Sequence, residues 1–272
     1  MKCEKRTVAQ GIAAYLAIML LFFLVSCQNR WQIGQREYYL WGIGAELLGA
    51  ALTACAIGAF GLQKQIGLRA HGFGRGLFAG ALMLAYSVAY FALNTINYGV
   101  GNFIRPDGVN LLLVIGMMIA VALFEELLFR GFLLNTFLNH FAGTSTGTKK
   151  RLLCCVFASS VLFGCNHFIN LIVRPELFVL TLCQAVYTIF AGVFFSAVYL
   201  KSKNLWSVIF YHALFDVATT IFYEILSADT LQNSNVHYAS AVDQAWGQGL
   251  FYVAVGVPLL VCGLAHLKKV EV

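Results

Sequence analysis

Eight long apolar segments restrict this fold more than any other feature of the sequence. Each is close to the ~20 residues that a transmembrane helix needs, and short connections join them. The expected spans are Val8–Ser26, Leu40–Leu62, Leu77–Ile96, Asn110–Leu134, Leu152–Ile169, Leu177–Leu200, Leu205–Leu226 and Gly249–Leu267. Only 11% of the 272 residues are charged, so a soluble protein of this composition would lack the polar surface to cover itself. The sequence therefore predicts an all-α, polytopic integral membrane protein in which residues 1–272 form a single membrane domain.

Positive charges divide unequally between the two ends of these spans. The richer end carries Lys2, Lys5, Arg6, Lys64, Arg69, Arg75, Lys149, Lys150, Arg151, Lys201, Lys203, Lys268 and Lys269. The poorer end carries Arg30, Arg36, Arg105 and Arg174, while Arg130 falls inside a span. The positive-inside rule therefore predicts a multi-pass protein of the cell membrane with both termini in the cytoplasm. Since no basic patch is interleaved with aromatic residues, we expect the lipid bilayer, and not nucleic acid, as a partner of these charges.

The cysteines do not indicate a metal ribbon or a disulfide framework. None of the eight forms a CxxC pair and most fall within the apolar spans, which is typical of small buried hydrophobes. The segment Leu24–Cys27 (LVSC) follows a basic start and an apolar run, as in a lipoprotein signal peptide. That apolar run is longer than the usual signal-peptide core and seven more spans follow, so we interpret it as an ordinary first helix.

Ionisable side chains inside the spans are the candidates for function. Burying a charge at the centre of a membrane helix costs about 2.5–3.5 kcal/mol on insertion scales, so such residues are rarely retained without a role. The candidates are Glu125, Glu126 and Arg130 in the fourth span, His167 in the fifth, and His212 and Asp216 in the seventh. Glu46 and Glu224 lie nearer the ends of the expected spans, where a charge costs little, and we interpret both as structural.

Helix geometry groups these candidates. Three pairs lie four residues apart and so share a helix face: Glu126 with Arg130, Phe163 with His167, and His212 with Asp216. Glu125 points about a quarter-turn away from Glu126, which allows it to face a cavity. Four groups could converge between three helices: Glu125, His167, His212 and Asp216. Sets of histidines and carboxylates activate water or bind a metal, although a lone Glu–Arg pair or a lone histidine is often structural.

Three short motifs resemble those of a known family. The stretch EELLFR (Glu125–Arg130) is similar to the EExxxR motif of the CAAX protease and bacteriocin-processing family of intramembrane proteases. FGCNH (Phe163–His167) is similar to its FxxxH motif, and HALFD (His212–Asp216) to its HxxxN/D motif. The motifs occur in the family's order, each on a separate expected span, and the region from about 110 to 226 carries the resemblance.

The resemblance implies an intramembrane endopeptidase that cleaves a membrane-associated protein or peptide in a buried polar catalytic cavity. Glu125 and His167 would activate the attacking water, which by resemblance enters from the cytoplasmic side. His212 and Asp216 would stabilise the transition state, and Glu126 and Arg130 would organise the site. Asp216 stands where eukaryotic prenyl-protein endopeptidases have Asn. An Asp has no amide group to donate to an oxyanion, so it is better suited to bind a metal or to orient His212.

Two points stay open at the level of sequence. The reaction could be driven by a glutamate-activated water, with no cofactor, or by a divalent metal such as zinc held by Glu125, His167, His212 and Asp216. The alternatives to an enzyme are a non-catalytic immunity or scaffold protein of the same fold and a proton- or ion-coupled transporter. A transporter also tolerates buried carboxylates, but no inverted repeat of interrupted helices favours it.

Overall fold

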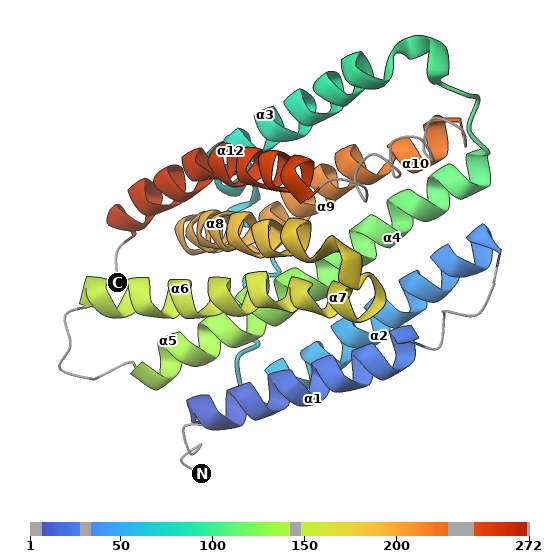
Figure 1. Cartoon of the computed structure of the whole chain (residues 1–272). Helices are drawn as coiled ribbons and strands as arrows, with labels where there is room; N and C mark the ends of the chain where they lie inside the picture. The colour runs from blue at the N-terminus through green and yellow to red at the C-terminus, as the bar shows by residue number, and fades with distance from the viewer. Residues whose placement is uncertain (1–6, 28–33, 142–147, 228–241, 271–272) are drawn as a thin grey trace.

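The computed structural model describes residues 7–27, 34–141, 148–227 and 242–270, and its regular elements there are helices (Figure 1). The α-helices are α1 (Val8–Cys27), α2 (Gln35–Ala59), α3 (Phe73–Tyr98), α4 (Gly108–Glu126), α5 (Asn135–Phe141), α6 (Thr148–Asn166), α7 (Asn170–Val173), α8 (Phe178–Ser202), α9 (Trp206–Thr220), α10 (Phe222–Ile225) and α12 (Val242–Lys268). A π-helix, Leu127–Leu134, joins α4 to α5, and short 3₁₀ turns occupy Val100–Asn102, His167–Ile169 and Pro175–Leu177.

Eight helical stretches within the described residues are long and apolar enough to cross a membrane. They are Val8–Ser26, Gln35–Ala59, Phe73–Tyr98, Gly108–Phe141, Thr148–Ile172, Pro175–Ser202, Trp206–Ile225 and Ala245–Lys268. Each overlaps one expected span, which confirms the prediction of an all-α polytopic membrane protein.

The fourth span is longer than expected, because it continues past Leu134 to Phe141. Asn135 and Thr136 look like the polar end of a span, yet both are buried. The Thr136 hydroxyl donates to the carbonyl oxygen of Phe132 at 2.8 Å, one turn back along the helix. Polar side chains that bond to their own helix backbone are tolerated inside a membrane, so sequence polarity places the end of this span too early.

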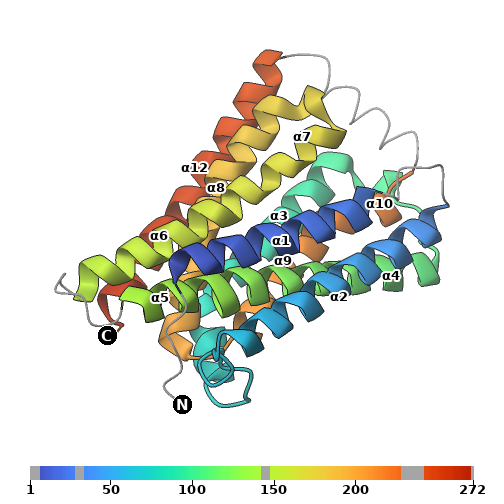
Figure 2. The ribbon, with the colours of Figure 1, turned by 90° about the horizontal axis from the view of Figure 1, so that it is seen from below.

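The helices form two groups that are close at one end and diverge at the other (Figure 2). In one group α8 lies between α6 and α12, and in the other α4 packs against α2 and α9 while α3 packs against α9. The groups approach each other at the end that holds α5 and diverge toward the end where α7 lies and α4 begins. The π-helix lies at the closed end, and all eight of its residues are buried.

Two glycines allow the first group to pack closely. A Cβ atom on Gly164 of α6 would lie 2.4 Å from the carbonyl oxygen of Ala185 in α8. A Cβ atom on Gly263 of α12 would lie 2.9 Å from the Cα atom of Phe194, also in α8. Membrane helices associate largely through such close backbone packing, because lipid supplies little hydrophobic drive. These contacts fix α8 between α6 and α12.

Candidate active site

The helix that carries the first motif widens within the motif. The π-helix Leu127–Leu134 begins at the residue after Glu126, and side chains donate to four of its carbonyl groups, one of them through the bond from Thr136 to Phe132. Asn135 Nδ2 donates to the carbonyl oxygens of Arg130 and Gly131, both at 2.9 Å. Ser159 Oγ, from α6, donates to the carbonyl oxygen of Phe129 at 2.7 Å. Wide turns of this kind occur frequently at functional sites, and this one sets the direction of the Arg130 side chain.

Glu126 and Arg130 form a completely buried ion pair. Arg130 NH1 donates to Glu126 Oε1 at 2.8 Å, and neither side chain has any exposed surface. The Arg130 guanidinium carbon lies 4.4 Å from the ring centroid of Phe163 and 5.4 Å from that of Phe195. The faces of these rings attract a cation and partly offset the loss of water around it. The pair predicted from the spacing of four is present.

The same Glu126 oxygen holds the imidazole of His212. Nδ1 of His212 lies 2.7 Å from Glu126 Oε1, and the ring stacks on Phe195 with centroids 5.3 Å apart and planes 25° apart. Because a carboxylate paired with arginine is an acceptor, Nδ1 carries the hydrogen and donates it to Glu126. The ring orientation is therefore fixed, with Nε2 turned toward the opposite side.

Two further carboxylates face that second nitrogen. Nε2 of His212 lies 3.5 Å from Glu125 Oε2 and 3.4 Å from Asp216 Oδ2. The Glu125 and Asp216 side chains are 13% and 22% exposed, whereas Glu126, behind the ring, is fully buried. The accessible part of this cluster is thus its Nε2 side.

His167 and His212 both contact the ring of Phe163. His167 lies in the 3₁₀ turn that follows α6, and its ring centroid is 5.7 Å from that of Phe163, one helical turn earlier. The ring centroid of His212 is 5.8 Å from that of Phe163. His167 Nε2 is buried and makes no hydrogen bond with any part of the chain that the structure describes. The structure therefore links five predicted residues directly, and the sixth, His167, shares with His212 the contact to Phe163.

The donor atoms do not form a preassembled metal site. Over the described ranges, no group of three or more His, Cys, Asp or Glu side chains is arranged so that it could hold a metal ion. In this arrangement the four ligands suggested by the sequence, Glu125, His167, His212 and Asp216, do not fit a zinc centre. No step proposed below passes through a metal.

Glu46 lies closer to the cluster than the sequence indicated. Its expected position near the end of a span is wrong, because α2 begins at Gln35 and places Glu46 near the middle of the helix. The flanking residues Gly42 and Gly49, on the same face, pack against Met117 and Phe124 of α4. Phe124 directly precedes Glu125, so this face of α2 lies against the part of α4 that carries the motif. Glu46 is a further carboxylate beside the candidate site.

Glu224 is structural, but not through contact with headgroups or water. Its side chain is buried, and Oε1 accepts hydrogen bonds from the Tyr39 hydroxyl and, at 2.5 Å, from Gln35 Nε2. Because Gln35 and Tyr39 belong to α2, Glu224 ties α10 to the start of that helix.

Comparison with known proteins identifies the motif-bearing region. The family described as type II CAAX prenyl endopeptidase Rce1-like matches residues 107–218, a region that contains all six predicted site residues. No curated protein and no solved structure matches the chain. This match confirms the predicted resemblance to the CAAX protease family. Members of the Rce1-like family typically cleave proteins.

Proposed function

We propose that this chain, similar over residues 107–218 to the type II CAAX prenyl endopeptidases, hydrolyses a peptide bond of a membrane-associated protein or peptide. One observation carries the proposal. The buried Glu126 holds the His212 ring so that Nε2 faces the accessible carboxylates Glu125 and Asp216. An oriented imidazole beside a free carboxylate, enclosed by apolar side chains, is an arrangement suited to general acid–base chemistry.

Glu125 is the base in this proposal. The 3.5 Å between Glu125 Oε2 and His212 Nε2 is too long for a direct hydrogen bond and leaves room for a substrate water to sit against both groups. Glu125 takes one proton from this water as its oxygen bonds to the peptide carbonyl carbon. When the tetrahedral intermediate breaks its C–N bond, Glu125 returns the proton to the departing nitrogen. Atoms and charge balance without a further reactant.

The two histidines act on the oxygens of the reaction. When Nε2 of His212 is protonated it can donate to the negatively charged oxygen of the intermediate while Nδ1 still donates to Glu126. Loss of one such donor costs roughly 10²–10³ in rate in enzymes that cleave acyl groups. His167 Nε2, the buried atom without a hydrogen-bond partner in the described chain, is suited to positioning the water beside Glu125. Asp216, 3.4 Å from Nε2, limits rotation of the His212 ring.

Glu126 and Arg130 are positioning residues, because neither has any surface that a substrate could touch. Arg130 holds the Glu126 side chain in place, and Glu126 keeps the hydrogen of His212 on Nδ1. A change at either residue should therefore alter the site through His212.

The exposure of the side chains favours one route to the site. Side-chain exposure is 13% at Glu125 and zero at Glu126 and Arg130. Along the antiparallel α9, it rises from 8% at His212 to 22% at Asp216. The rise along α9, between residues on one face, favours an approach from the end where α4 begins and the helix groups diverge. This end carries few Lys and Arg residues, so the exposure disagrees with the cytoplasmic route implied by resemblance. Cleavage by the protein in vesicles of known orientation distinguishes the two routes.

Quantitative profiling of peptide termini tests the activity in cells. Cells that express the intact chain should contain new peptide ends that are absent with Glu125→Gln. Glu176→Gln is the matched control, because this glutamate is exposed, is paired with Arg174 and belongs to none of the three motifs. If both variants give the same set of termini as the intact chain, the protein is not a protease of this kind. The alternative of a non-catalytic immunity or scaffold protein of the same fold would then be favoured.

A further inference from the structure

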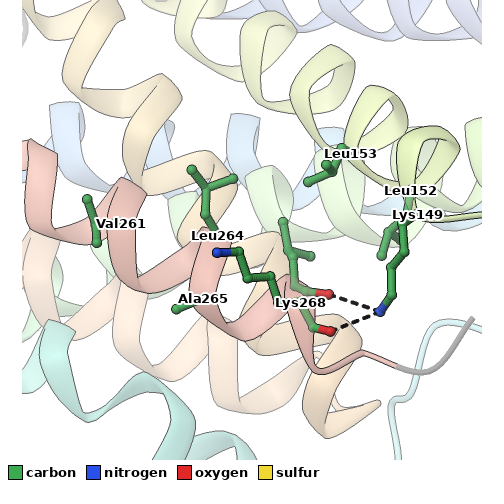
Figure 3. Close-up of a pocket in the computed structure, with 8 residues that line it drawn as sticks. Lys149, Leu152, Leu153, Val261, Leu264, Ala265 and Lys268 are labelled. Carbon is green, nitrogen blue, oxygen red and sulfur yellow. Dashed lines mark hydrogen bonds between the residues drawn. The ribbon is translucent and has the colours of Figure 1, made fainter.

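A second feature of the fold lies away from the motif residues, between α6 and α12 near the end of the bundle that carries most of the lysines. The groove there, which we call the α6–α12 groove, has a volume of about 580 Å³ (Figure 3). Its walls are mostly aliphatic, with Leu152 and Leu153 from α6 facing Leu264 and Leu267 from α12. It shares no residue with the candidate active site.

The groove is open to the surroundings of the helices. Both of its walls belong to stretches able to cross a membrane, Thr148–Ile172 and Ala245–Lys268. Val261, which also lines it, is 59% exposed. In a bilayer these apolar walls face hydrocarbon chains, so the natural occupant of the groove is a lipid chain.

One end of the groove is fixed by Lys149. Its ammonium group donates to the carbonyl oxygens of Lys268 at 3.1 Å and of Leu267 at 3.5 Å, and also to that of Val270. These bonds satisfy carbonyl groups at the end of α12 and hold that end against the start of α6. The side-chain ammonium of Lys268 points away from those carbonyls, as Figure 3 shows. Lys268 is thus the cation of the groove that is available to an anion.

Among the residues that the structure describes, the charges around the groove are of one sign. Lysines gather where α6 begins and where α8 and α12 end: Lys149, Lys150, Lys201, Lys203, Lys268 and Lys269. Every aspartate or glutamate in the described ranges lies in the middle of a span or toward the opposite end. A ligand that suits the groove is therefore apolar along most of its length and negatively charged at one end.

We propose that the α6–α12 groove binds an anionic phospholipid. One acyl chain lies against the leucine walls, and the headgroup phosphate lies beside Lys268. Basic pockets between membrane helices recognise anionic headgroups by the same combination of charge and apolar wall. The proposal is independent of the proposed protease activity.

Native mass spectrometry of the full-length protein, titrated with phosphatidylglycerol or phosphatidylcholine, tests this site. We expect one phosphatidylglycerol to be retained in preference to phosphatidylcholine. Lys268→Ala should weaken its binding about fivefold, the effect of one lysine close to an anionic lipid surface. Leu264→Trp should also weaken it, because the indole fills the groove. If Leu264→Trp does not accumulate, Leu264→Phe takes its place.

Lys269→Ala is the matched control, because it removes the same charge at the neighbouring position but does not line the groove. We expect this variant to bind phosphatidylglycerol as the intact chain does. The proposal is overturned if Lys269→Ala weakens binding as much as Lys268→Ala, which would indicate only diffuse attraction to the basic end. Equal retention of phosphatidylcholine, or binding that is unchanged by filling the groove, overturns it as well.

Discussion

Removing the cation of the buried ion pair should destabilise the protein more than most single substitutions do. Arg130→Met keeps an unbranched side chain between the rings of Phe163 and Phe195 but leaves the Glu126 carboxylate without its arginine. Glu126 has no exposed surface, and its Oε2 atom makes no hydrogen bond within the described chain. Breaking a buried pair from one side costs about 3–5 kcal/mol, since the remaining charge is buried without compensation.

A second substitution shows whether this loss comes from the stranded charge. Glu126→Gln together with Arg130→Met replaces both charges by neutral side chains of similar shape. Exchange of a whole buried pair for neutral groups is often nearly neutral, so the double variant should be more stable than Arg130→Met alone. The two changes should therefore be strongly non-additive, with an interaction energy at the upper end of the usual ~0.5–3 kcal/mol for residues in contact.

Reversible unfolding in mixed detergent micelles measures both quantities, with Arg36→Met as the control. Arg36 pairs with Asp107 at 2.9 Å, but the side chains are 52% and 48% exposed, so this change should have little effect. The double variant should regain stability without regaining proteolysis, because a neutral amide oxygen at position 126 holds the Nδ1–H of His212 less firmly than a carboxylate and supplies no negative charge to a protonated ring. The reasoning is refuted if Arg130→Met is no more destabilising than Arg36→Met, or if the two changes at the buried pair simply add.

Three other changes test the fold. Asp107 accepts hydrogen bonds from the backbone N–H groups of Val109 and Asn110, and the bond from Asn110, with the charge of Arg36, lowers the pKa of the Asp107 carboxyl. The charged carboxylate therefore stabilises the start of α4 at pH values above its ordinary pKa, and this stabilisation is lost as the pH falls through the lowered pKa. Asp107→Ala should lower the melting temperature at neutral pH, and Asp107→Asn should lower it much less. Asn135→Leu should cost about 1–3 kcal/mol in detergent unfolding, because two buried carbonyl oxygens of the π-helix lose their donor. Gly164→Val should lower the free energy of unfolding by at least about 1–3 kcal/mol, because the larger side chain crowds α8. Unchanged stability in any of these variants would contradict the contact that the variant removes or crowds.

Sequence patterns were informative where they follow a single helix. The apolar lengths predicted all eight spans, and the spacing of four predicted the contact between Glu126 and Arg130. The edge contact between Phe163 and His167 follows from the same rule. In each case the position of the residues depends only on the repeat of a single helix, so it can be predicted from their spacing in the sequence.

Contacts between helices were harder to predict. The bond from His212 to Glu126 joins residues 86 apart in the chain, and no local rule selects Oε1 of Glu126 over that of Glu125. Phe195, which stacks on His212, stands in a fully buried apolar stretch of α8 where nothing distinguishes it from its neighbours. Glu46 was assigned a structural role because the start of α2 was placed five residues too late, at Leu40 in place of Gln35. Its carboxylate in an apolar helix was the signal that could have identified it.

The most direct test of the account is the rate of peptide cleavage by the purified protein in liposomes. The substrate is a peptide that spans a cleavage site found by terminus profiling, and the proteins compared are the intact chain, Glu125→Gln and Glu176→Gln. Removing a positioned base should lower the rate by a factor of at least about 10²–10⁴, and the unfolding midpoint should barely change because an amide is cheaper to bury than a carboxylate. Glu176→Gln should cleave at the rate of the intact chain. A folded Glu125→Gln protein that cleaves at that rate as well would contradict the claim that the buried cluster performs the hydrolysis.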